Sequence, residues 1–181
     1  KAQDSAKSGR PYALLLADVI GSLSGGGQEL NQDFFEARPV KHRGILVIST
    51  DKGLCGALNG NLFRLLADVD SSAKYVAVGK RATQYLSRGQ RDLLADFSIP
   101  DKPSFGDVRK IVEFLLRKYE DGDVDTVEVL YTSFVNTLKQ EPEIIQLLPL
   151  TNLDDMLQKL HVRFGSPDDE QVKDNREIIF E

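Results

Sequence analysis

The stretch GILVISTDKGLCGALNGNLFR, residues 44–64, contains the pattern that decides the fold. A continuous apolar run, residues 45–48, leads directly into a turn that contains Gly53, Gly56 and Gly60. Such a short apolar run is typical of a strand buried on both faces of a sheet. Apolar residues at spacings of three and four then follow, as they do in an amphipathic helix. The stretch therefore predicts a strand, a glycine-rich turn and a helix.

The same unit recurs along the chain. A second strand is expected over residues 75–78 and a second helix over residues 79–89. Ser104 can cap a third helix, because its hydroxyl can accept a hydrogen bond from the first turn, and Gly122 can end that helix. Residues 124–135 alternate and are rich in branched and aromatic side chains, which favours a third strand.

These elements predict the fold class. Residues 144–148 lie between two prolines and are expected to form an edge strand, where proline is tolerated. Strands that alternate with helices imply parallel pairing through right-handed crossovers. We therefore predict an α/β fold, a three-layer Rossmann-like and mostly parallel sheet with helices on both faces. Residues 12–23 carry a separate amphipathic helical stripe ahead of it.

The composition excludes several classes of protein. The chain has 181 residues, 41% of them hydrophobic, which is enough for one domain with a sizeable core. A net charge of -5 argues against nucleic-acid binding, and no apolar run approaches the roughly 20 residues that span a bilayer. The single cysteine, Cys55, excludes an intrachain disulfide and fits a reducing compartment. Because the chain begins at Lys1, we expect a designed or proteolytic fragment.

The glycine-rich turn has the right position for a phosphate site but lacks the residues. A loop between a strand and a helix lies where Rossmann-like proteins bind ligands. A Walker loop requires Gly-Lys-Ser/Thr, whereas Gly56 is followed by Ala57 and Leu58, and the glycine spacing is not that of the dinucleotide fingerprint. A Rossmann-type small-molecule or nucleotide-binding enzyme remains an alternative on position alone. A phosphorylated signalling module would use Asp51, but the accompanying acids and lysine are missing.

No catalytic, cofactor-binding or metal-binding residue is predicted. Cys55 lies at a strand-to-helix turn, where a thiol could serve as a nucleophile, yet a nucleophile elbow requires glycine two residues on, where Ala57 stands. The histidines, His42 and His161, have no motif around them, so Cys55 is better interpreted as a small packing residue. The acid pairs in residues 152–175 lack the ligand spacing of an EF-hand.

Three segments resemble one protein family. Residues 44–64 resemble the gamma subunit of F-type ATP synthases, in which a strand continues into Ser-(Ser/Thr)-Asp-(Arg/Lys)-Gly-Leu-Cys-Gly. SGRPYALLLADVIGSL, residues 8–23, resembles the end of that family's long N-terminal helix. FVNTLKQEPEIIQLLPL, residues 134–150, resembles its later Asn-Thr and Gln-Leu-Leu-Pro-Leu segment. The resemblance is weak over residues 70–101 and nearly absent over residues 152–175, where we expect an acidic insertion.

The resemblance implies a rotor subunit without catalytic activity. Members of this family form the central stalk and couple rotation of the membrane ring to ATP synthesis or hydrolysis in the catalytic hexamer. The implied partners are the alpha/beta hexamer, an epsilon-type stalk subunit and the membrane c-ring, with no cofactor and no nucleic acid. The implied location is peripheral, on the inner face of an energy-transducing membrane, either the cytoplasmic side of a bacterial plasma membrane or the stromal side of a thylakoid.

The resemblance also implies which residues contact partners. The family's matching turn lies near an acidic loop of the catalytic subunits, so Lys52 and Cys55 are expected to be contact residues. Gly53 and Gly56 would then permit a tight turn and close helix–sheet packing. By geometry, Lys80 and Arg81 follow the second strand at the same end of the sheet and would extend a basic rim. The full set of expected interface residues is Asp51, Lys52, Gly53, Leu54, Cys55, Gly56, Lys80, Arg81, Ile178 and Phe180.

We expect the chain to divide into four segments. Residues 1–23 would be the end of the N-terminal coiled-coil helix and residues 24–43 a linker. Residues 44–150 would be the Rossmann-like domain, and residues 151–181 the acidic insertion and a return segment. The family's shaft is an antiparallel coiled coil, but no sustained heptads occur in this sequence. The chain is therefore expected to be the globular part of a rotor.

Overall fold

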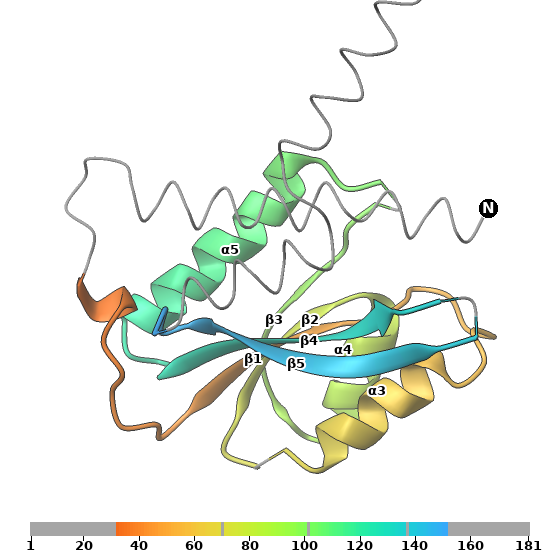
Figure 1. The fold of residues 1–181 in the computed structure, drawn as a ribbon, viewed down its shortest axis with the longest axis horizontal. Coiled ribbons are helices and arrows are strands. Elements are labelled where there is room, and N and C mark those ends of the chain that lie inside the picture. The colour runs from red at the N-terminus through yellow and green to blue at the C-terminus, as the bar shows by residue number, and fades with distance from the viewer. Residues whose placement is uncertain (1–31, 70, 101, 137, 152–181) are drawn as a thin grey trace, which may run out of the picture. The chain divides into compact units, whose positions relative to one another are not determined.

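A five-stranded sheet organises the chain in the computed structural model, which describes residues 32–69, 71–100, 102–136 and 138–151 (Figure 1). The helix expected over residues 12–23 and the segment 152–181, with Ile178 and Phe180, lie outside the described residues. The elements in chain order are η1 (Gln32–Phe34), β1 (Arg43–Ile48), α3 (Leu58–Ala67), β2 (Lys74–Val78), α4 (Lys80–Arg88), β3 (Asp92–Phe97), α5 (Phe105–Glu120), β4 (Thr126–Phe134) and β5 (Gln140–Leu148).

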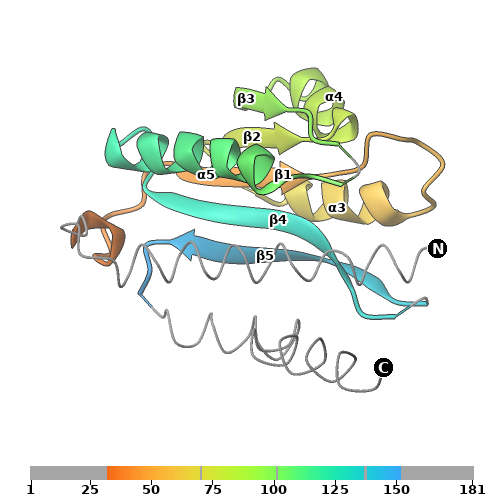
Figure 2. The ribbon, with the colours of Figure 1, turned by 90° about the horizontal axis from the view of Figure 1, so that it is seen from above.

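The sheet is mostly parallel, as the sequence predicts. Its strands follow the order β3-β2-β1-β4-β5, which can be read across Figure 2. The pairs β1–β2, β1–β4 and β2–β3 are parallel, and β5 pairs antiparallel with β4 at one edge. The fold class is therefore confirmed, including the edge position of β5.

Helices cover both faces of the sheet. Figure 1 shows α5 above the sheet and α3 and α4 below it. The side chain of Leu46 packs in the cluster that includes Ile111 and Leu115 of α5, whereas its neighbours in β1 pack against α3 and α4. Leu62 in α3 is fully buried in this second cluster. Alternate residues of β1 thus face opposite layers, which confirms that this apolar run is buried on both faces.

Two features of the sheet differ from the prediction. The strand β3 was not predicted, because it is a half-buried edge strand, DLLADF, with acids among its exposed positions. The strand β5 is longer than expected and includes Pro142, which lies opposite Thr132 of β4. An edge strand tolerates proline because one of its sides makes no ladder hydrogen bonds.

The helix ends follow their predicted signals. Ser104 caps α5 in a capping box: its hydroxyl accepts from the backbone N–H of Asp107, and the Asp107 carboxylate accepts from the Ser104 N–H at 2.9 Å. The Ser104 hydroxyl also donates to the Asp107 carboxylate at 2.7 Å, and this bond, together with the one from the Ser104 N–H, lowers the pKa of Asp107. Gly122, with a φ of +74°, ends the same helix. The sequence signals therefore position α5 across the sheet as expected.

Candidate functional site

The turn between β1 and α3, residues 49–57, is closed by one threonine and one asparagine. We call it the β1–α3 turn. The Thr50 hydroxyl donates to the Lys52 carbonyl oxygen at 2.7 Å, and the Asn59 side-chain nitrogen donates to the Thr50 hydroxyl at 2.8 Å. The Thr50 N–H donates back to the Asn59 side-chain oxygen at 3.4 Å. Because Asn59 belongs to α3, these bonds tie the start of the turn to the helix that follows it.

The tip of the β1–α3 turn presents Leu54 to solvent. Leu54 has a φ of +60° and a relative exposure of 108%, and Gly56 has a φ of +58°. A left-handed conformation is ordinary for glycine but costs on the order of 1 kcal/mol for a leucine. Leu54 therefore combines full exposure with a backbone conformation that leucine does not favour.

The same turn caps the helix that follows β2. The Asp51 carboxylate accepts from the Lys80 N–H at 2.9 Å, and the Thr50 carbonyl accepts from the Arg81 N–H at 3.3 Å. The Ser49 hydroxyl accepts from the N–H of the third residue of α4, at 2.8 Å. Three consecutive residues thus satisfy the first three N–H groups of α4. The N–H groups at the N-terminus of a helix can hold an anion, and at α4 the chain itself occupies them.

The close backbone approach in this region occurs at Gly79. It has a φ of +93°, and a Cβ there would lie 2.3 Å from the Ser49 carbonyl oxygen. A Cβ on Gly53 would meet only the Arg81 guanidinium, at 2.3 Å, and one on Gly56 would meet no atom within 4 Å. The expected tight turn at Gly56 is present, but the expectation of close helix–sheet packing at Gly53 and Gly56 was wrong. Instead, the contact at Gly53 brings Arg81 onto the turn.

Three cations surround the tip. Lys52, Lys80 and Arg81 are exposed, and none of them forms an ion pair with another residue of the described ranges. The carboxylate of Asp51 is engaged by the N–H of α4. The structure therefore brings six of the expected positions, residues 51–56, together with Lys80 and Arg81 at one end of the sheet. The result is a basic surface around an exposed leucine.

Cys55 is exposed, so its interpretation as a packing residue was wrong. Its Sγ lies 3.5 Å from the carbonyl oxygens of Lys52 and Gly53 and 3.8 Å from the Thr50 hydroxyl. His42 precedes β1, at the other end of the sheet, and its Nδ1 lies 3.3 Å from the Ser72 carbonyl oxygen. His42 is therefore not placed to act as a base for the Cys55 thiol. His161 lies outside the described residues.

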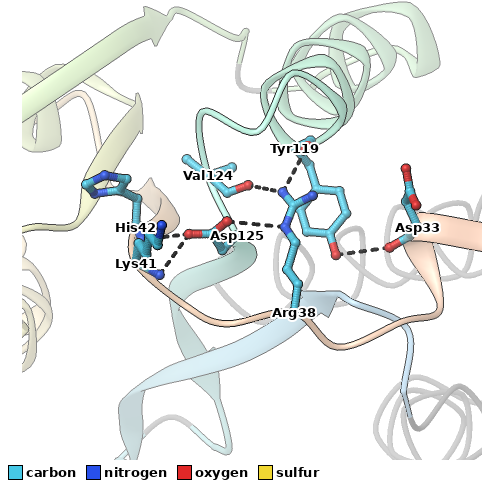
Figure 3. A network of polar contacts seen from close by, with 7 residues as sticks. All are labelled: Asp33, Arg38, Lys41, His42, Tyr119, Val124 and Asp125. Atoms are coloured by element: carbon cyan, nitrogen blue, oxygen red, sulfur yellow. Dashed lines mark hydrogen bonds and ion pairs between the residues drawn. The ribbon is translucent and has the colours of Figure 1, made fainter.

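The opposite end of the sheet carries a network centred on Arg38 (Figure 3). The Arg38 guanidinium lies 4.1 Å from the centre of the Tyr119 ring and donates to the carbonyl oxygens of Tyr119, at 2.7 Å, and Val124. Its Nε lies 3.2 Å from the Asp125 carboxylate. That carboxylate also accepts from the N–H groups of Lys41 and His42, at 2.8 and 2.9 Å. The network fixes the segment before β1 against the junction of α5 and β4.

The network shifts two pKa values. Burial alone would raise the pKa of Asp125, but the His42 and Lys41 N–H donors and the Arg38 charge outweigh it and hold that pKa below its usual range. Burial raises the pKa of the Tyr119 hydroxyl, which donates to the Asp33 carbonyl oxygen at 3.1 Å. No sequence motif signals this network, because its members are far apart in the chain.

The described residues contain neither a metal-binding cluster nor a helix suited to a membrane. Within the described ranges, no group of three or more histidine, cysteine, aspartate or glutamate side chains is placed to hold a metal ion. Among those same residues, no helix has the length and apolar character that crossing a membrane requires. The described residues form a Rossmann-like domain with a capped, basic turn at the carboxyl ends of its strands.

Comparisons with known proteins give the family. The sequence profile described as ATP synthase matches residues 1–181. The chain is 47% identical over 160 residues to the ATP synthase gamma chain of Opitutus terrae, covering 88% of this chain and 54% of the relative. It is 38% identical to that of Methylacidiphilum infernorum, with 85% and 55% covered. The chain belongs to the gamma subunits of the ATP synthase family. It spans about half the length of these relatives.

Solved structures show the same fold. A chain of the Euglena gracilis mitochondrial ATP synthase rotor aligns with a TM-score of 0.52 at 17% identity, over 85% of this chain and 60% of that one. A chain from the central stalk and c-ring of the Tetrahymena thermophila mitochondrial enzyme aligns with a TM-score of 0.50 at 18% identity, over 86% and 77%. At these identities the likeness establishes the fold alone.

Proposed function

We propose that this chain is the globular part of the central stalk of an F-type ATP synthase. In this role it is a non-catalytic rotor element that couples rotation of the membrane c-ring to ATP synthesis or hydrolysis in the catalytic alpha/beta hexamer. The observation that carries the proposal is the capping of α4 by residues 49–51. The N-terminus of α4 is capped from within the chain, while Lys52, Leu54 and Cys55 are exposed.

The β1–α3 turn is the proposed contact with the catalytic subunits. Lys52, Lys80 and Arg81 suit an acidic partner, because unpaired exposed cations steer and orient an oppositely charged surface. Leu54 and Cys55 supply the part of the contact that excludes water. Asp51, Gly53 and Gly56 act indirectly: Asp51 caps α4, Gly53 accommodates Arg81, and Gly56 shapes the turn.

The remaining partners follow from the family and are part of the same proposal. We assign an epsilon-type stalk subunit and the membrane c-ring as further partners, with Ile178 and Phe180 on the side of the ring. The location is peripheral, on the inner face of an energy-transducing membrane. Residues 1–23 and 151–181 are assigned to the coiled-coil end and to the acidic insertion with its return segment, on either side of the Rossmann-like domain.

A reversible cross-link in the assembled synthase tests this function. Cys55, the chain's single cysteine, would be paired with a cysteine placed in an acidic segment of a catalytic subunit. We expect oxidation to form an intersubunit disulfide and stop ATP hydrolysis, and reduction to restore the activity. A Cys55→Ser, Val40→Cys double variant is the matched control, since Val40 is also exposed but precedes β1. Absence of the cross-link at Cys55 in every nucleotide state would contradict the proposed contact.

Calorimetry separates the rotor from the alternative of a nucleotide-binding enzyme. Because the glycine-rich turn before α3 has no phosphate-reaching lysine after Gly56, and the first three N–H groups of α4 are already capped, titration of the chain with magnesium-ATP should release no binding heat. One-to-one binding with micromolar affinity would instead support an enzyme of the Rossmann type.

A further inference from the structure

Most of the exposed large apolar side chains of the described residues lie at one end of the sheet. Six such side chains are exposed in these residues, and five of them lie at or just after the carboxyl ends of β1 and β4. These five are Ile48, Leu54, Phe134, Val135 and Leu138. The sixth, Val40, lies before β1. Single exposed apolar residues need no explanation, but such a concentration indicates a surface that a partner covers.

The hairpin between β4 and β5 contributes three of these residues. We call Phe134, Val135 and Leu138 the hairpin tip. Leu138 is 98% exposed. The Asn136 side chain accepts from the N–H groups of Leu138 and Lys139, both at 2.9 Å. These bonds join the Asn136 side chain to the backbone at Leu138 and Lys139, where Leu138 is exposed.

The hairpin tip and the β1–α3 turn point the same way. Both lie at the right-hand end of the sheet in Figure 1 and in Figure 2. β1 and β4 are neighbours, and Leu130 is the last residue of β4 that pairs with β1. Phe134 ends β4 four residues later, so the hairpin extends roughly 13 Å beyond that pair, on strands about 4.8 Å apart.

The hairpin tip and the β1–α3 turn differ in chemistry: the first is apolar and the second is basic. Lys139 pairs with Glu141 at 3.1 Å, so the hairpin adds apolar area with little net charge. The turn adds Lys52, Lys80 and Arg81, which have no ion-pair partner in the described ranges. A partner that covers both must offer acidic groups to the turn and apolar side chains to the hairpin.

We propose that the hairpin tip is a second contact point for the partner of the β1–α3 turn, and that this partner is an acidic, amphipathic protein segment. The inference rests on the proposed function, in which the turn contacts a catalytic subunit. The turn steers and orients the segment through charge, and the hairpin tip retains it through apolar burial. Loss of the hairpin tip should therefore increase the dissociation rate more than it decreases the association rate.

Photo-cross-linking in the assembled synthase tests the shared partner. A benzoylphenylalanine would be placed at position 54, at position 138 or at position 40, one per complex. We expect positions 54 and 138 to capture the same subunit, through peptides of one acidic segment, and position 40 not to capture it. Capture of the catalytic subunit from position 54 but not from position 138 overturns the hairpin contact alone. Absence of that subunit from the products at position 54 counts against the proposed function itself.

A substitution with a matched control measures the contribution of the hairpin tip. Leu138→Ser removes an exposed leucine, and Val40→Ser removes an exposed valine from the opposite end. We expect Leu138→Ser to speed dissociation of the chain from the complex about tenfold, as loss of one buried leucine contact does, and Val40→Ser to leave the rate unchanged. Both isolated variants should have the same melting temperature as the wild type. A rate within twofold of wild type for Leu138→Ser would overturn the proposal.

Discussion

The two ends of the sheet use charged residues in opposite ways. At the amino end, Arg38 and Asp125 pair with each other and with backbone groups, and both side chains are partly buried. At the carboxyl end, Lys52 and Arg81 are exposed and form no ion pair within the described ranges. A charge that satisfies backbone groups stabilises the fold, whereas an exposed and unpaired one contributes little to it. The comparison assigns stability to the first end and recognition to the second.

Two leucines of neighbouring segments should show the largest difference in stability. Leu62 is fully buried between α3 and the sheet, and Leu54 is fully exposed in the β1–α3 turn. We expect Leu62→Ala to lower the free energy of unfolding by about 3 kcal/mol, because it leaves a cavity, and Leu54→Ala to lower it by less than about 0.5 kcal/mol. Urea denaturation of both variants checks this. Similar losses for the two would mean that the turn is part of the core.

Two aspartates compare the ends directly. Asp125→Ala removes the acceptor of two N–H groups and leaves the Arg38 guanidinium without its ion pair, so we expect a loss of about 2 kcal/mol. Asp51→Ala removes one exposed cap of α4 and should cost about 1 kcal/mol or less. Denaturant titration at neutral pH measures both. An equal or larger loss of stability for Asp51→Ala would contradict the assignment of the stabilising network to the amino end of the sheet.

The Asp125 network should also make the free energy of unfolding depend on pH in the acid range. Its pKa is below the usual value in the folded chain, so its contribution is complete above the pKa of an unfolded aspartate, about 4, and is lost as the pH falls further. Asp125→Asn should lower stability at neutral pH and make the decline below about pH 4 shallower. Unfolding midpoints across this range check the sign, with Glu120→Gln as the control. An unchanged acid limb in Asp125→Asn would exclude Asp125 from the acid response.

The smallest expected effect on stability belongs to the basic rim. Lys52→Ala and Arg81→Ala should each change the free energy of unfolding by less than about 0.5 kcal/mol, since neither cation has an ion-pair partner in the described residues. Both should nevertheless slow association with the catalytic complex and reduce its dependence on salt. Thermal melting and association rates at two salt concentrations measure this. A large loss of stability would reclassify either residue as structural.

Periodicity and end signals predicted most of the fold. The apolar run of β1, the cap at Ser104 and the stop at Gly122 act within a few residues, so they can be read directly from the sequence. The edge strand β3 was not predicted, because it is only half buried and therefore lacks a strong apolar pattern. Local signals are enough for elements that are buried on a whole face or stripe, and they weaken at the edges of the sheet.

The candidate site was only partly predictable. The motif located the turn, but the register of β1 and β2 decides that residues 49–51 meet the N-terminus of α4. The exposure of Cys55 depends on the left-handed conformations of Leu54 and Gly56, which no composition rule gives. The Arg38–Asp125 pair joins residues far apart in the sequence. Each of these depends on tertiary packing, so a single sequence does not contain a local signal for it.

Hydrogen exchange across the whole chain tests the central claim most directly, because one measurement reports on both ends of the sheet. The exchange of backbone amides would be compared between the isolated chain and the assembled synthase. We predict slower exchange on assembly for the loop amides of residues 52–56 and for the hairpin amides around Leu138. Amides near Arg38 and Asp125, already held in the isolated chain, should exchange at unchanged rates. New protection confined to the Arg38 end, with the β1–α3 turn unaffected, would contradict the assignment of recognition to the carboxyl ends of the strands.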